Sequence, residues 1–212
     1  MSIEVKPDGS VLAVAPIDAP EHEIRWKVEK SGAWILRQQR ELAQLPPPLP
    51  ERQYVSGESW RYLGRQHRLR VIIGTQEGVR VTRGELLVTA KTPERAENVL
   101  NSWFRNRAQS LLAERMSVCL ERASHYGIEH SGDFALRQMR TQWGSCTKVG
   151  KLNFNPRLVQ APKECIDYVI LHELCHLREF NHSAAYYRLL GRVLPDWKKR
   201  RERLNRLVEL PQ

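Results

Sequence analysis

The sequence contains little cysteine and no long hydrophobic run. Its four cysteines are scattered, without the close pairs that zinc ribbons and disulfide-rich domains show. No apolar stretch approaches the roughly 20 residues that a membrane-spanning helix needs. The N-terminal residues also lack the basic and apolar segments of a secretory signal. We therefore expect free thiols, no membrane partner and a cytoplasmic location.

Negative charge is in short supply, and the formal net charge is +10. This excess favours a polyanionic partner, such as nucleic acid or nucleotide phosphates. The alternative is an ordinary solvated surface. The clearest basic run, "KKRRERLNRL" at 198–207, places its apolar residues on one helical face. Most of its charges are therefore expected to face solvent.

The first part of the chain, residues 1–90, is expected to be mainly β with one helix. Apolar residues alternate on both sides of Asp8-Gly9, which predicts a hairpin. A helical pattern runs from about residue 20 to 45, where the prolines of 46–50 end it. Four short β-like runs between 54 and 90, separated by glycine-containing turns, predict a small antiparallel sheet.

The second part, residues 91–212, is expected to form an α+β domain. Its patterns alternate between helical and extended periods, with proline or glycine at the boundaries. The expected elements are a long helix capped by Thr92 and ending near Gly127, a strand over 134–142 that turns at Gly144, a strand with Leu152 and Phe154 on one face, a helix opened by Pro162, and helices over 183–193 and 195–208.

The stretch "VILHELCHLREFNHS", 169–183, contains three histidines and a glutamate at a spacing typical of metal sites. On a helix, His172 and His176 lie one turn apart on the same face, so both imidazoles can bind one ion. Glu173 lies near that face and can contact a water on the ion. This is the HExxH pattern of two nitrogen ligands and a general base.

His182 is the candidate third ligand. It follows His176 by six residues, so it can reach the same ion only if the helix stops and the chain folds back. We expect the break at Phe180-Asn181, because asparagine tolerates the left-handed conformation that ends helices, and we expect Ser183 to cap the next helix. Glu179 occupies the place of the glycine in the metzincin signature, so the turn must be made differently.

Three neutral imidazoles with an open fourth position suit Zn²⁺. Zinc would lower the pKa of its water, and Glu173 would take the proton. The resulting hydroxide would attack a carbonyl or phosphoryl centre. Cys175 is turned about 300° from His172 around the helix, so we expect it to pack as a core thiol.

Several motifs together resemble the YgjP-like metallopeptidase family. They are the WGSC of 143–146, Asn155 with Leu158, the HELCHL of 172–177, the HS pair of 182–183, the two aromatics Tyr186-Tyr187 and the PDW of 195–197. The upstream pieces "DGSVLAVAP", "WILRQQ" and "YLGRQHRLRV" are similar to that family as well. Two positions depart from its pattern: Pro156 stands where an aromatic is common, and Tyr187 where tryptophan is frequent.

The resemblance implies a zincin-like catalytic core, with an active-site helix, a small sheet beside it and an edge strand at the cleft. It implies zinc held by His172, His176 and His182, with Glu173 as the base. The chain also resembles, more distantly, the SprT-like proteases that act on DNA-bound proteins.

The substrate side is predicted only in outline. The strand over 134–142 is a candidate cleft edge, to which an extended peptide would add; alternatively it is an internal strand. Arg140, Trp143 and Tyr186 are candidate substrate contacts, although a packing role also suits Tyr186.

Three functions follow from these patterns. The first is a zinc metallopeptidase that acts on a polypeptide substrate. The second is a metal-dependent nucleoside triphosphate pyrophosphohydrolase, against which the lack of a glycine-rich phosphate loop argues. The third is a nucleic-acid-associated protein with a structural zinc, which would normally have four protein ligands rather than three.

Overall fold

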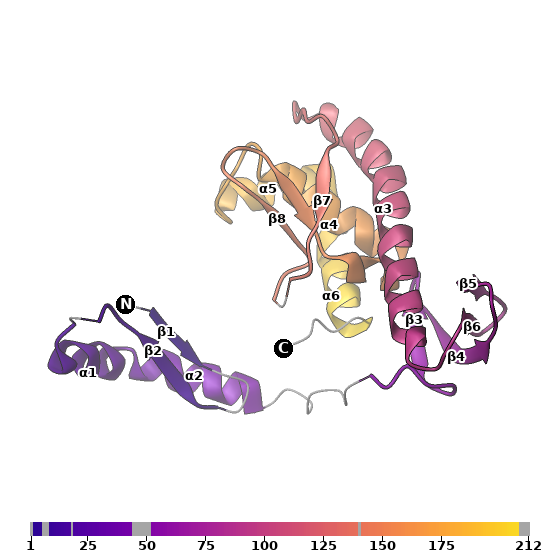
Figure 1. The fold of residues 1–212 in the computed structure, drawn as a ribbon. Coiled ribbons are helices and arrows are strands. Elements are labelled where there is room, and N and C mark those ends of the chain that lie inside the picture. The colour runs from indigo at the N-terminus through magenta and orange to yellow at the C-terminus, as the bar shows by residue number, and fades with distance from the viewer. Residues whose placement is uncertain (1, 6–8, 18, 44–51, 140, 208–212) are drawn as a thin grey trace. The chain divides into compact units, whose positions relative to one another are not determined.

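The computed structural model describes residues 2–5, 9–17, 19–43, 52–139 and 141–207 (Figure 1). Its contacts divide the chain into two compact units, residues 1–51 and residues 52–211. The sequence patterns suggested a boundary at residue 90. The contacts place it earlier because the strands between 59 and 90 pack against the long helix that follows them. In the part of the chain that the structure describes, no helix has the length and apolar character needed to cross a membrane.

The first unit combines a hairpin with two helices: β1 (Ser2–Val5), β2 (Val11–Val14), α1 (Glu21–Lys30) and α2 (Gly32–Ala43). β1 and β2 pair antiparallel, which confirms the predicted hairpin. The single helix predicted over 20–45 is interrupted at Ser31, whose amide caps the end of α1. Serine followed by glycine is a weak helix-forming pair, which explains the interruption. The prolines of 46–50 lie outside the described residues.

The second unit begins with a four-stranded sheet, formed by β3 (Ser59–Tyr62), β4 (Arg65–Ile73), β5 (Gly78–Val81) and β6 (Glu85–Ala90). The strand order is β3-β4-β6-β5. β4 and β6 pair in parallel, so the prediction of a purely antiparallel sheet was wrong at this pairing. The reason is topological: β6 returns between β4 and β5 instead of adding at the edge.

The helix α3 (Arg95–Ser124) packs its N-terminal half on this sheet (Figure 1). Phe104 stacks on Trp60 of β3, with ring centroids 5.6 Å apart. Thr92 does not cap the helix as predicted. Its side chain hydrogen-bonds the carboxylate of Glu94, and a turn over 92–94 precedes the first helical residue.

The remaining elements build a second, smaller sheet with helices beside it. They are β7 (Phe134–Leu136), β8 (Gly144–Cys146), β9 (Leu152–Phe154), the 3-10 helix η1 (Pro156–Gln160), α4 (Lys163–Cys175), α5 (Ala184–Val193) and α6 (Trp197–Leu207). The strand order is β7-β9-β8. The strand predicted over 134–142 is only three residues long, and Gly144 opens a strand rather than a turn. The burial of Leu152 and Phe154 confirms their shared face, and the α+β class is confirmed.

The helix α4 is fixed from two sides. Arg115 of α3 forms a bidentate ion pair with Asp167 of α4, in which Nε and Nη2 donate to Oδ1 and Oδ2 at 2.7 and 2.8 Å. From the first sheet, the β3–β4 turn donates to the carbonyls of η1, and its Gly64 lies against Pro162 at the start of α4. A Cβ on Gly64 would come within 2.6 Å of the Pro162 ring. The helix that carries the HExxH residues is thus held in place before any ligand binds.

Candidate metal centre

The three histidines of the sequence motif converge through their Nε2 atoms. Nε2 of His182 lies 3.1 Å from Nε2 of His172 and 3.2 Å from Nε2 of His176. All three ligand atoms lie within 4.8 Å of one another. Two nitrogens bound to one tetrahedral zinc at about 2.0–2.1 Å are separated by roughly 3.3 Å. The spacing therefore fits a tetrahedral ion with one position left open.

The chain reverses early enough for His182 to join. Helix α4 ends at Cys175, and His176 is its C-cap. A turn follows, in which the amides of Arg178 and Glu179 donate to the carbonyl of Cys175. The break predicted at Phe180-Asn181 therefore comes several residues sooner. None of residues 176–183 has a positive φ, so no left-handed asparagine is needed.

Ser183 caps the next helix, as predicted. Its side chain accepts a hydrogen bond from the amide of Tyr186, three residues into α5. This cap fixes where α5 begins, at Ala184, two residues after His182.

A backbone carbonyl orients one imidazole. Nδ1 of His176 donates to the carbonyl oxygen of Glu179 at 3.1 Å. That bond places the proton on Nδ1 and leaves the lone pair of Nε2 directed at the other histidines. Glu179 is the residue that replaces the glycine of the metzincin pattern, and it contributes through its main chain.

The imidazole of His172 has one nitrogen without a hydrogen-bond partner among the described residues. Nδ1 of His172 is buried and has no hydrogen-bond partner in the part of the chain that the structure describes. Burial, together with the nearby His176, His182 and Arg201, lowers the pKa of His172 to about 3. Burial also lowers the pKa of His176. Both imidazoles are thus neutral at neutral pH, which is the form that binds metals.

Glu173 lies in a cradle made by β8. Its side chain is buried, and burial raises its pKa to about 8, although a hydrogen bond from the backbone of Cys146 acts in the opposite direction. A Cβ on Gly144 would lie 2.7 Å from Oε1 of Glu173. The carboxyl group occupies the space that any larger residue at position 144 would fill.

The strand edge beside Glu173 is β8. Trp143 accepts from the amide of Asn155, and Thr147 donates to the carbonyl of Lys151, so these alternate residues face β9. Gly144 and Cys146, between them, direct their backbone groups away from β9. β8 is an edge strand in contact with α4. The strand predicted at the cleft edge corresponds to β7, which lies at the opposite edge of the sheet.

Asn155 holds the loop that leads into β8. It is fully buried, and its Nδ2 donates to the carbonyls of Met139 and Gln142 at 2.8 and 3.2 Å. Its Oδ1 accepts from the amide of Arg157. All of the amide's polar atoms are therefore used. Arg140, a predicted substrate contact in this loop, lies outside the described residues.

The aromatic residues near the histidines have different positions. Tyr186 is fully buried; its ring stacks on His176 with centroids 4.5 Å apart, and its hydroxyl donates to the carbonyl of His172. It forms the floor of the site, which does not suit the substrate contact expected of it. Trp143 is half-buried at the start of β8. Tyr187 is exposed and stacks between His182 and Trp197.

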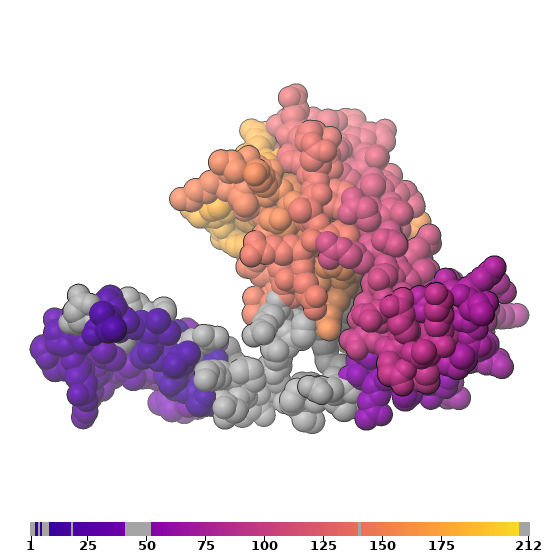
Figure 2. Space-filling view, in the orientation of Figure 1, coloured from indigo at the N-terminus to yellow at the C-terminus, as the bar shows by residue number. Residues whose placement is uncertain are grey.

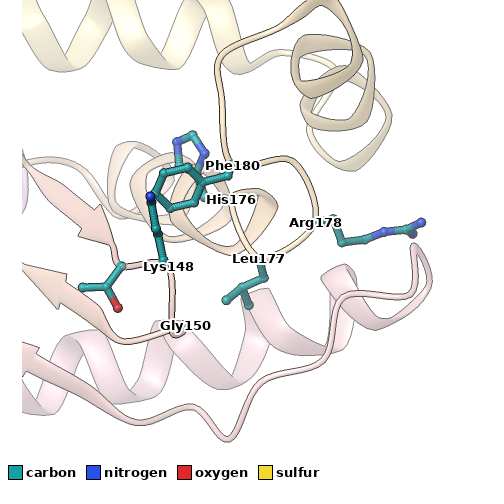
Figure 3. Close-up of a pocket in the computed structure, with 7 residues that line it drawn as sticks. Lys148, Gly150, His176, Leu177, Arg178 and Phe180 are labelled. Carbon is teal, nitrogen blue, oxygen red and sulfur yellow. The ribbon is translucent and has the colours of Figure 1, made fainter.

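A pocket of about 480 Å³ adjoins His176. Its walls come from the β8–β9 turn and from the turn after α4. Figure 3 shows the rings of Phe180 and His176 side by side, with the Lys148 side chain directed towards them and Arg178 pointing away. The lining residues are Thr147, Lys148, Gly150, His176, Leu177, Arg178 and Phe180.

The cysteines behave as predicted. All four thiols are free. Cys175 is fully buried in the core, and burial raises its pKa to about 12, so it is a packed thiol; it is not part of the group formed by His172, His176 and His182. Cys146 is half-buried, and its backbone amide is the group that contacts Glu173.

The sequence patterns missed the residues that hold the predicted ones in place. Gly144, Asn155 and the carbonyl of Glu179 all act in this way. A usable signal existed for Gly144, because a glycine inside a strand often marks a close approach of another group. The role of Glu179 left no signal, since any residue supplies a carbonyl.

Comparison with known proteins gives two matches of different strength. A family model described as "YgjP-like, metallopeptidase domain" matches residues 1–207. No curated protein matches the chain. Among solved structures, the chain is similar to the crystal structure of the metallopeptidase zymogen of Pyrococcus abyssi abylysin, with 21% sequence identity and a TM-score of 0.40. That similarity covers 46% of this chain and 99% of the other.

Proposed function

We propose, from the premise that the chain belongs to the YgjP-like family of metallopeptidases, that it is a zinc-dependent peptidase with Glu173 as its general base. His172, His176 and His182 would hold the metal. The observation that carries this proposal is the convergence of three Nε2 atoms at the end of the helix that bears Glu173. Nε2 of His182 lies 3.1 Å from that of His172 and 3.2 Å from that of His176.

The donor set suits zinc better than magnesium or calcium. Neutral imidazole nitrogens are preferred by zinc, whereas magnesium and calcium prefer oxygen ligands. When bound, zinc would polarise the scissile carbonyl and make a water molecule acidic near neutral pH. Three protein ligands leave one position open for this chemistry.

Glu173 would move the proton. Its carboxylate takes one proton from the attacking water, whose oxygen bonds to the carbonyl carbon. The same proton then passes to the leaving amine nitrogen as the carbon–nitrogen bond breaks. The raised pKa of Glu173, about 8 in the absence of a metal, would be lowered by a cation at the histidines. A hydrogen bond from the Cys146 amide helps to fix the orientation of the Glu173 carboxylate.

The open edge of β8 would bind the substrate backbone. Gly144 and Cys146 direct main-chain groups away from β9 and lie next to Glu173. An extended polypeptide pairing with this edge would carry one of its carbonyl groups past the base. A folded domain offers no free extended segment, so we expect unstructured polypeptides to be the better substrates.

The pocket beside His176 is placed to receive a substrate side chain. Leu177 and the exposed ring of Phe180 provide apolar surface, and Lys148 provides a cation at the rim (Figure 3). We expect this pocket to favour a large side chain and to disfavour a positively charged one.

A parallel assay tests the proposed function. The zinc-loaded protein and its Glu173→Gln variant are incubated with an unstructured polypeptide and, separately, with nucleoside triphosphates. We expect cleavage of the polypeptide, loss of that cleavage by about 10²-fold or more in the variant, and equal zinc content in both proteins. Triphosphate hydrolysis that depends on Glu173, without polypeptide cleavage, would overturn the peptidase assignment. Undiminished cleavage in the variant would remove Glu173 as the base.

A further inference from the structure

The sheet β3-β4-β6-β5 has one covered face and one open face. Residues of its inner face pack on α3: Trp60 stacks on Phe104, and the hydroxyl of Tyr62 accepts from Arg107. Leu69, Leu86 and Val88 are buried on this side as well. Because side chains alternate along a strand, the residues between them face away from α3.

Arginines gather on the open face. The register aligns Arg70 of β4 with Leu87 of β6 and Arg80 of β5, so these three side chains form one row. Arg68 lies two residues from Arg70 along β4, in a row with Ser59 of β3 and Glu85 of β6. Arg61 of β3 opens the next row, opposite Gln66.

These arginines cross the whole sheet. Neighbouring strands lie about 4.8 Å apart, so the three strand spacings from β3 to β5 together measure roughly 14 Å. Arg68 and Arg70 are separated by roughly 6.8 Å along β4, a spacing comparable with that of neighbouring phosphates along a nucleic-acid strand. Arg68, Arg70 and Arg80 are exposed, and Arg61 is half-buried.

Little negative charge balances the open face. Glu85 is the single acidic residue in the four strands, and it approaches Arg70 at 3.8 Å. Within the described residues, Arg61, Arg68 and Arg80 have no ion-pair partner. The two nearby acids are engaged elsewhere: Glu58 accepts from the amides of 53 and 54, and Glu77 pairs with Arg95.

We infer that this open face, called here the arginine face and made of Arg61, Arg68, Arg70 and Arg80, binds the phosphate backbone of duplex nucleic acid without regard to sequence. Guanidinium groups match phosphate oxygens with two parallel hydrogen bonds, which lysine cannot do. All four cations of the face are arginine. The chain's net charge of +10 adds long-range attraction for such a partner.

The chemistry of the arginine face favours a duplex over the other anionic partners. It has no exposed aromatic ring on which unpaired bases would stack, because Trp60 and Tyr62 point inwards. It has no large apolar anchor at its centre of the kind that protein partners use, since Leu87 is half-buried and Ile72 lies at the end of β4. A membrane surface would require several apolar side chains to insert, whereas the exposed side chain of Ile72 lies at the end of β4, away from the centre of the face.

This binding would be independent of the metal centre. The arginine face belongs to the same compact unit, residues 52–211, but uses none of the residues near the histidines. In Figure 2 the strands that carry it appear in purple and magenta at the lower right. The binding itself requires no catalysis, so its failure and failure of the peptidase assignment are separate results.

The test compares two double variants of the full chain that lose the same charge. Arg68→Gln with Arg80→Gln alters the arginine face; Arg105→Gln with Arg122→Gln alters two exposed arginines on α3. Fluorescence anisotropy with a labelled mixed-sequence DNA duplex is recorded over a range of salt concentrations. We expect the first variant to bind about tenfold more weakly and its salt slope to fall by about 2, as expected for two lost phosphate contacts. The α3 variant should bind like the unaltered chain.

Three outcomes would overturn the inference. One is equal loss of binding in both double variants, which would indicate attraction by net charge alone. Another is unaltered binding in the Arg68/Arg80 variant. The third is binding of polyglutamate or of anionic phospholipid vesicles as tight as that of the duplex and equally dependent on Arg68 and Arg80. Circular dichroism and polypeptide cleavage by each variant show that the fold is intact.

Discussion

Gly144 of β8 and Glu173 of α4 are in direct contact: a Cβ on the glycine would lie 2.7 Å from Oε1 of the glutamate and 2.8 Å from its Cγ. The backbone of Gly144 is not in the left-handed region, so alanine is allowed there by the main chain. The three heavy atoms nearest to such a Cβ all belong to the side chain of Glu173.

Gly144→Ala is therefore expected to displace the proposed base without touching the histidines. A misplacement of about 1 Å typically costs about 10²-fold in rate, so we expect kcat for polypeptide cleavage to fall by about that factor while zinc content stays unchanged. Ser145→Ala, in the same strand, is the matched control and should keep near-normal turnover. Normal kcat in Gly144→Ala would show that the position of Glu173 does not limit the reaction.

The buried carboxyl group of Glu173 should also make the metal-free protein sensitive to pH. Its pKa is about 8 when folded, against 4.5 as the ordinary value. Between these values the folded state keeps a proton that the unfolded chain has released, so the free energy of unfolding falls as pH rises. We expect a loss on the order of a few kcal/mol by about pH 8.

Glu173→Gln isolates this effect. Glutamine does not ionise, so the variant should lack the decline in stability. His172 acts in the opposite direction: its pKa is lowered from 6.5 to about 3, so its contribution is present above pH 6.5 and lost as pH falls. Since both proteins contain His172, the difference between their urea unfolding curves, measured with a chelator across this range, reports on Glu173. Parallel pH profiles would refute the burial of an ionisable carboxyl group at this position.

Asn155 should be needed for the loop before β8. Asn155→Asp replaces two donors by a carboxylate that faces the carbonyls of Met139 and Gln142 in a fully buried place. We expect a loss of roughly 2–4 kcal/mol in the free energy of unfolding, measured by urea denaturation. Asn153→Asp, on the neighbouring half-buried position, should cost clearly less. Equal costs would mean that the contacts of Asn155 add nothing specific.

Metal binding should stabilise the fold. An ion that binds only the folded state at about 100 times its Kd adds about 2.7 kcal/mol, so zinc should raise the Tm and a chelator should reverse the rise. Magnesium should have little effect, because the site offers nitrogen donors rather than oxygens. A larger Tm shift with magnesium than with zinc would point to a different ion and to a different chemistry.

The parts of the site that depend on local sequence were predicted well. The one-turn spacing of His172 and His176, the capping by Ser183 and the core position of Cys175 follow from helix geometry and short-range chemistry. The short strand with Leu152 and Phe154 followed from their alternation.

The parts of the fold and site that depend on contacts between distant residues were not predicted. The parallel pairing of β4 with β6 depends on where a later strand inserts, which no local pattern encodes. The early end of α4 depends on a turn closed by the carbonyl of Cys175, and the burial of Tyr186 depends on three imidazoles packed around its ring. The cleft edge was predicted on the strand over 134–142, whereas β8 is the strand beside Glu173. Both β7 and β8 are edge strands, so local patterns do not distinguish them.

The measurement that tests the central claim most directly is the zinc affinity and stoichiometry of His182→Ala beside those of the unaltered chain. His125→Ala, which alters a histidine at the end of α3, is the control. The unaltered chain and the control should bind one zinc per chain. His182→Ala should bind it more than about a hundredfold more weakly, since even loss of a group behind a metal ligand typically costs 10–100-fold. Zinc binding of normal affinity in His182→Ala would contradict the three-histidine site.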